Sequence, residues 1–136
     1  MKTIQVKRVY EQVCEADGTR ILVERLWPRG LTRAKLQADN WVKEVAPSDG
    51  LRRWFAHDPA KWPEFRRRYF AELDQHPEAI QVICTAVEAG PVTLLYSAHD
   101  TEHNNAVALR EYLLTHAAGR GCDLSPGEEV AAVGCC

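Results

Sequence analysis

Two short, almost uninterrupted apolar runs constrain the fold of this chain more than any other feature. They cover residues 21–23 and 92–97, and such runs are typical of strands that are covered on both faces of a sheet. An earlier segment, residues 4–9, largely alternates apolar and polar side chains, which is the pattern of a half-buried strand. We therefore predict an α/β fold, in which helices flank a small sheet that is mixed or mostly parallel.

Four further segments carry apolar residues at helical spacing. They are residues 35–45, 58–73, 77–89 and 101–116, the last of them capped by Asp100 or Thr101. In the second segment, Asp58 followed by Pro59 is a typical helix start. Pro63 would clash with the carbonyl group four residues earlier if the helix already ran from Pro59. We therefore predict a one-turn lead-in and a restart near Trp62.

The composition is that of a single domain. With 136 residues, 46% of them hydrophobic and 26% charged, the chain suits one α/β domain over residues 1–118. Residues 119–136 turn rich in glycine, proline and acidic side chains, so we expect a C-terminal tail that is either flexible or forms a short edge strand. No apolar run approaches the roughly 18 residues of a membrane span. We expect a cytoplasmic protein without a membrane partner.

The cysteines and the net charge narrow the function classes. Cys14, Cys84, Cys122, Cys135 and Cys136 show no CxxC spacing and no paired histidine motif, so we expect reduced thiols and neither a disulfide framework nor a zinc site. We expect no metal and no cofactor. The formal net charge of -2 gives no global basic field, which argues against a dedicated nucleic-acid binder but leaves local arginine patches open. The oligomeric state is left open as well.

A turn that contains several residues suited to ligand binding follows the first apolar run. Arg25 and Arg29 offer forked donors that suit a carboxylate or a phosphate, and Trp27 offers a flat face for stacking. Pro28 and Gly30 restrict and shape the backbone of the turn. We expect an anionic ligand here, although ion pairs of both arginines with carboxylates of this chain are the structural alternative.

The second apolar run also ends in polar residues. His99, Asp100, His103 and Asn104 follow it, and they would meet the arginines at one sheet edge if the two strands are parallel neighbours. The next helix would then direct its N-terminus at the same edge. His103 is a candidate acid or base with Asp100 as the group that orients it. A capping role for Asp100 and a backbone-bonded His103 are the alternatives.

Glu24 is unusual within the apolar run that precedes the turn. A carboxylate in such a run needs a partner, and Arg25 points to the opposite face of the strand. If Glu24 is buried beside His103, it is a third catalytic candidate, as a base or an orienting group. A solvent-facing sheet surface is the equally weighted alternative.

Several of these segments resemble a known family. Residues 23–30, 54–62, 91–98 and 102–106 are similar to the YeaO-like branch of the domain of unknown function 488, in order and spacing over residues 3–116. The resemblance implies little about activity, since the family is uncharacterised. The chain has neither a glycine-rich loop after a strand nor a helix-turn-helix pattern, so methyltransferase and transcriptional-regulator labels find no support. Longer family members place a cysteine near the second strand-to-helix turn, and this chain does not.

The function that these patterns favour is the binding of a small phosphorylated or carboxylated ligand at the strand ends. Histidine acid/base catalysis is open, and so is the question whether the protein is an enzyme at all. The alternative is a non-enzymatic regulatory module whose arginines contact nucleic acid or a protein partner.

Overall fold

The computed structural model describes residues 3–115. The strands are β1 (Ile4–Arg8), β2 (Thr19–Leu22), β3 (Asn40–Trp41) and β4 (Val92–Tyr96). The α-helices are α1 (Arg33–Leu36), α2 (Asp49–Phe55), α3 (Trp62–Leu73), α4 (Pro77–Ala89) and α5 (Asn105–Thr115). Single 3₁₀ turns, η1 (Glu15–Asp17), η2 (Lys43–Val45) and η3 (Pro59–Lys61), complete the elements.

The four strands form one parallel sheet in the order β1-β4-β2-β3. Leu94 of β4 lies opposite Val6 of β1 on one side and Ile21 of β2 on the other. All five residues of β4 are buried, as expected for a central strand with both faces covered. The predicted α/β fold with a small sheet, mixed or mostly parallel, is confirmed. The two apolar runs are parallel neighbours, which meets the condition for their polar ends to lie at one sheet edge.

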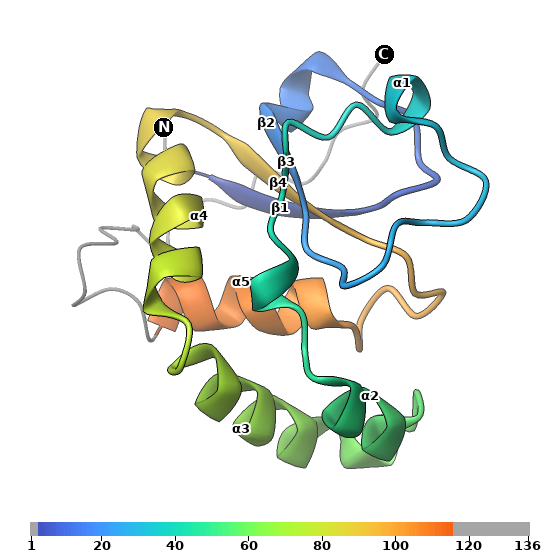
Figure 1. Ribbon diagram of the computed structural model, residues 1–136, viewed down its shortest axis with the longest axis vertical. Helices are drawn as coiled ribbons and strands as arrows, with labels where there is room; N and C mark the ends of the chain where they lie inside the picture. The colour runs from blue at the N-terminus through green and yellow to red at the C-terminus, as the bar shows by residue number, and fades with distance from the viewer. Residues whose placement is uncertain (1–2, 116–136) are drawn as a thin grey trace.

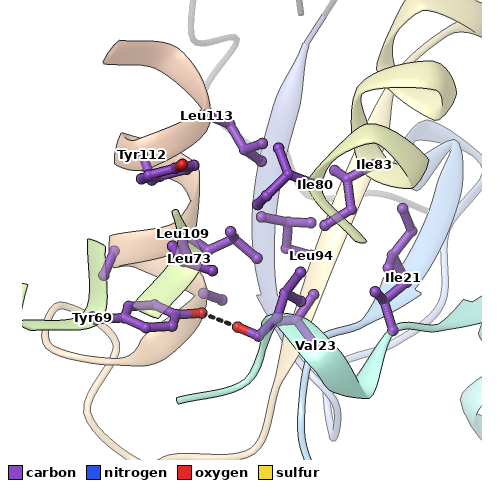
Figure 2. Close-up of a cluster of buried hydrophobic side chains, with 14 of the residues drawn as sticks. Ile21, Val23, Tyr69, Leu73, Ile80, Ile83, Leu94, Leu109, Tyr112 and Leu113 are labelled. Atoms are coloured by element: carbon purple, nitrogen blue, oxygen red, sulfur yellow. Dashed lines mark hydrogen bonds between the residues drawn. The ribbon is translucent and has the colours of Figure 1, made fainter. Parts of the chain in front are cut away.

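Each face of the sheet packs on its own apolar cluster. On one face, Leu94 and Ile21 contact a large core to which α2, α3, α4 and α5 contribute. Figure 1 shows α5 between the sheet and the pair α2 and α3, and Figure 2 shows the labelled side chains of this core meeting. On the other face, Leu22 and Leu95 pack on a smaller cluster with Leu36 of α1.

The segment predicted as a helix over residues 35–45 is the main error of the sequence analysis. Its helical part is the single turn α1, which the Thr32 side chain caps and which ends at Gln37 with a φ of 50°. The chain then extends, and Trp41 pairs with Leu22 of β2. Tertiary contacts overrule the helical spacing here, because the Trp41 ring packs against Trp27 and its Nε1 donates to the carbonyl of Glu24.

The other helix starts are partly confirmed. The lead-in η3 and the restart of α3 at Trp62 agree with the prediction, and the Asp58 carboxylate accepts a hydrogen bond from the Ala60 N–H. The helix expected from residue 101 begins only at Asn105. The prediction is wrong because Asp100 closes a separate turn, while the side chain of Asn104 caps the helix by accepting from the Val107 N–H.

A buried charge cluster lies near the amino-terminal ends of β2 and β4. Asp17 is 1% exposed and pairs with Arg20 at 2.5 Å and with Lys7 at 3.0 Å. The Thr93 hydroxyl donates to the carbonyl of Asp17, which ties this cluster to β4. Gly18 follows with a φ of 65°, and a Cβ there would lie 2.2 Å from the carbonyl oxygen of Pro91. This end of the sheet is tightly packed and leaves no room for a larger residue at that position.

Three further expectations concern the rest of the chain. The tail predicted over residues 119–136 lies outside the described residues. Cys84 is a core residue as expected, but its sulfur is in a disulfide bond, so the prediction of reduced thiols is wrong for this cysteine. Between residues 3 and 115, no helix is long and apolar enough to cross a membrane.

Candidate functional site

A cavity of about 680 Å³ lies at the carboxyl-terminal ends of β2 and β4. This is where ligands bind in open parallel sheets. The cavity is lined by the segments that follow the two strands, by the loop before α2, and by α2 and α3. Its lining residues are Glu24, Arg25, Ala46, Pro47, Arg52, Arg53, Phe55, His57, Phe65, Ser97, Ala98, His99, Asp100, His103, Asn104 and Asn105.

Glu24 leaves β2 toward the cavity and connects the ends of the two central strands. Its Oε2 accepts a hydrogen bond of 3.2 Å from the N–H of Ser97, just beyond β4. Asn105 lies beside it and donates through Nδ2 to the carbonyl of Val23. Burial raises the pKa of Glu24 above its ordinary value of 4.5, although the Ser97 N–H and the positive charge of Arg52 oppose this shift. Glu24 is therefore a partly desolvated carboxylate in a cavity.

Three arginines line the same cavity as this carboxylate. Arg25 points a terminal nitrogen at the carbonyls of Pro47 and Ala46, at 3.3 and 3.5 Å. Its Nε is buried without a hydrogen-bond partner in the described part of the chain, and Asp49 lies 3.9 Å away. Arg52 and Arg53 of α2 add two more guanidinium groups. The arginines of the lining outnumber its carboxylates by three to two, so these groups alone give the lining one excess positive charge.

Arg25 does not pair with Asp39 or Glu44, which are carboxylates that the ion-pair alternative offers, and its ion pair in the described part of the chain is the long contact with Asp49. Asp39 instead accepts a hydrogen bond of 2.8 Å from the backbone N–H of Arg20. The Arg25 side chain is 41% exposed and Asp49 is 52% exposed, so their long contact is screened by water. Arg25 can therefore receive an acceptor from a ligand.

The polar residues after β4 form a compact group. Asp100 Oδ1 accepts from the N–H groups of Glu102 and His103, and Oδ2 lies 3.0 Å from His103 Nδ1. The hydrogen bonds from these two backbone N–H groups lower the pKa of Asp100, and the bond from Glu102 has the larger effect. The His103 side chain lowers this pKa further. The edge of the His103 ring meets Trp62, with ring centroids 5.3 Å apart. His103 is thus held in place by a carboxylate, as an acid/base group would be.

The helix terminus contributes less than the sequence suggested. The N–H groups of Glu102, His103 and Val107 already bond to side chains of Asp100 and Asn104. Asn104 is 3% exposed and also donates to the carbonyl of Asp100. With these donors occupied, the cationic character of the cavity comes from its arginines.

Two residues of the turn predicted as a binding site do not line the cavity. Trp27 lies against Trp41 on the other face of the sheet, with ring centroids 5.4 Å apart, and its Nε1 donates to the carbonyl of Leu31. Arg29 is exposed, and its carbonyl accepts from the Tyr10 hydroxyl. The cavity brings together Glu24, Arg25, His99, Asp100, His103 and Asn104 of the predicted site residues.

Sequence reasoning missed the contributions of β1 and α2. Arg8 donates through Nε to the carbonyl of Ala98, and one of its terminal nitrogens lies 3.2 Å from His99 Nδ1. Arg52, Arg53 and His57 enter the cavity lining from α2 and the residues that end it. Their only sequence signal was a pair of arginines before a His-Asp pair. His57 adopts a φ of 57°, an uncommon left-handed conformation for a residue other than glycine.

The fold and the motifs define an α/β protein of a recognised family. The chain belongs to it: residues 3–130 match the family described as "Inactive DUF488-N3 subclade". Among its relatives is the "Uncharacterized protein YeaO" of Escherichia coli K12, which is 44% identical over 110 residues, covering 81% of this chain and 96% of that protein. The resemblance to the YeaO-like branch is thereby confirmed.

Mycobacterial proteins match a shorter part of the chain. An uncharacterised protein of Mycobacterium tuberculosis strain H37Rv is 44% identical over 70 residues, which cover 52% of this chain and 59% of that protein. An uncharacterised Mycobacterium bovis protein matches equally well. No solved structure matches the chain.

Proposed function

We propose that this protein binds a small phosphorylated or carboxylated ligand in the cavity at the ends of β2 and β4. The observation that carries the proposal is the Arg25 guanidinium, whose buried Nε lacks an acceptor and which lines the cavity together with Arg52 and Arg53. Buried polar groups normally have hydrogen-bond partners, and a ligand oxygen would supply this one.

The size of the cavity favours a ligand larger than a free phosphate ion. Small-molecule sites measure roughly 300–1,000 Å³, and this cavity of about 680 Å³ falls within that range. Charge-assisted hydrogen bonds contribute about 1.5–3 kcal/mol each, most of which association costs would offset for a bare ion. Phe55 and Phe65 in the lining offer apolar surface for the remainder of the ligand.

Binding without catalysis is the form of this function that we favour. The description of the family as an inactive subclade supports it. The paired Asp100 and His103, at 3.0 Å, support histidine acid/base catalysis as the second candidate, with Glu24 as a further proton-accepting group. A His103→Gln variant that still binds the ligand, together with no turnover of that ligand by the unaltered protein, would decide for binding alone.

A nucleic-acid surface has less support. The exposed arginines of α3 are paired, since Arg67 and Arg68 both bond to Glu64 and Arg66 bonds to Glu111. Paired arginines offer little free charge to a phosphate backbone. The cavity arginines are therefore the better candidates for anion recognition.

The test is a thermal-shift screen of phosphorylated metabolites, nucleotides and carboxylates against the protein and two matched variants. Arg25→Ala removes a cavity arginine, whereas Arg29→Ala removes one from the same turn outside the cavity. A ligand at a hundred times its Kd stabilises by about 2.7 kcal/mol, and we expect Arg25→Ala alone to lose that shift. A shift that only Arg29→Ala abolishes, or none with any compound, would contradict the proposal.

A further inference from the structure

The carboxylate of Glu24 has no evident use in a site that only receives an anion. In the region from residue 3 to 115, no lysine or arginine nitrogen lies within 4.0 Å of it. An ionised carboxylate out of water is costly unless it is paired, and here it would repel an incoming anion. Its bond to the Ser97 N–H would be kept by a neutral glutamine. Its charge therefore points to a ligand group.

On the basis of the proposed anion-binding function, we infer that the ligand also carries an ammonium group, and that Glu24 receives it. The ligand class is a small zwitterionic amine, with a phosphate or carboxylate at one end and an amine at the other.

The placement of the charges fits such a ligand. Glu24 and Arg25 are consecutive residues that leave β2, and both line the same cavity. The positive charge of Arg52 lowers the pKa of Glu24, although the two side chains form no ion pair and both line the cavity. Opposite charges thus line one cavity, which suits a ligand that itself carries opposite charges.

An ionised carboxylate is an acceptor only, so it selects for a donor. An ammonium brings three donors and a charge that compensates for desolvation, which a hydroxyl does not. The three histidines of the lining do not replace it, because His103 is paired with Asp100, His99 lies against Arg8, and no ion pair joins His57 to Glu24 within residues 3–115. Among the described cavity carboxylates, Asp100 contacts the His103 ring, whereas Glu24 has no basic side chain within 4.0 Å.

The experiment compares probes that differ only in the ammonium group. Dissociation constants are measured at pH 7.5 by NMR titration for O-phosphoethanolamine against ethyl phosphate, and for β-alanine against propionate. We expect the ammonium member of at least one pair to bind about tenfold more tightly, which corresponds to about 1.4 kcal/mol. In Glu24→Gln, that preference falls to near one, while the plain anion binds equally well or more tightly.

The control is Glu44→Gln, which removes an exposed carboxylate outside the cavity and leaves the preference intact. The spectrum of free Glu24→Gln establishes that this variant is folded. Equal binding within each pair, or a preference that survives Glu24→Gln, overturns the zwitterion inference alone. If none of the four compounds binds the unaltered protein, both the zwitterion inference and the proposed anion-binding function are contradicted.

Discussion

At the scale of single residues, Glu24 makes both a stabilising and a destabilising contribution to the fold. It joins the ends of β2 and β4 by accepting from Ser97, yet burial raises its pKa above 4.5. A raised acid pKa means that the folded state holds its proton more tightly than the unfolded chain does. Ionised Glu24 therefore lowers the free energy of unfolding. This destabilisation is complete above the folded-state pKa of Glu24, and it is absent below 4.5, where the carboxyl is protonated in both states.

We accordingly expect Glu24→Gln to melt at a higher temperature than the unaltered protein at pH 7, since glutamine keeps an acceptor for the Ser97 N–H without a charge. The difference should shrink as the pH falls and disappear below about 4.5, the ordinary pKa. Thermal unfolding followed by circular dichroism between pH 3.5 and 8 measures this. A variant that is less stable at pH 7, or a difference independent of pH, would contradict it.

At the scale of elements, one serine sets the position of α2 and thereby of the cavity arginines on it. Ser48 caps α2 by accepting from the Leu51 N–H at 3.2 Å. Its hydroxyl and its N–H also donate to the two carboxylate oxygens of Glu72 on α3, at 2.6 and 2.8 Å. The start of α2 is thus fastened to the last turn of the next α-helix, α3.

Ser48→Ala should lower the free energy of unfolding by about 1–2 kcal/mol, since it removes both a cap and a partner of Glu72. Chemical denaturation gives the number. Thr32→Ala is the matched comparison. Thr32 caps the single turn α1 through one hydrogen bond of 3.1 Å, and its side chain contacts no carboxylate of the described residues. A loss at Thr32 as large as that at Ser48 would show that the contact with Glu72 adds nothing.

At the scale of the whole molecule, β4 holds two cores on opposite faces of one sheet. Leu94 contacts the large cluster beneath α3, α4 and α5, and Leu95 contacts the small one with α1 and the two tryptophans. Both side chains are 0% exposed. Figure 2 shows Leu94 among the larger core, in which the Tyr69 hydroxyl donates to the carbonyl of Val45. Because consecutive residues of one strand join the two clusters, neither can be lost alone.

Leu94→Ala and Leu95→Ala should therefore each cost about 2–5 kcal/mol, and each should unfold in a single transition. The measurement is guanidinium denaturation followed by tryptophan fluorescence and by far-ultraviolet circular dichroism. Trp27 and Trp41 pack against the small cluster, and Trp54 and Trp62 pack against the large one, so fluorescence reports on both clusters while circular dichroism reports on the helices. Two curves that separate in Leu95→Ala would show that the small cluster unfolds independently.

The sequence by itself determined the strands β1, β2 and β4, the long helices α3, α4 and α5 apart from the start of α5, and the family to which the chain belongs. Continuous apolar runs marked β2 and β4, and the Asp58-Pro59 and Pro63 pattern marked the break before α3. Such patterns report how a segment is buried, and burial is a local requirement of each element. They also placed Glu24, Arg25 and the polar residues after β4 at one sheet edge, because parallel neighbours end together.

Only the tertiary structure decided which side chains face the cavity. Trp27 and Arg29 belong to the turn that was predicted as a binding site. Trp27 packs against the small core instead, and Arg29 is exposed to solvent. Arg52 joins the cavity because Ser48 and Glu72 hold α2 there, and Trp41 extends into β3 because its ring packs on Trp27. Contacts between residues far apart in the chain settle these positions, and a local pattern carries no information about them.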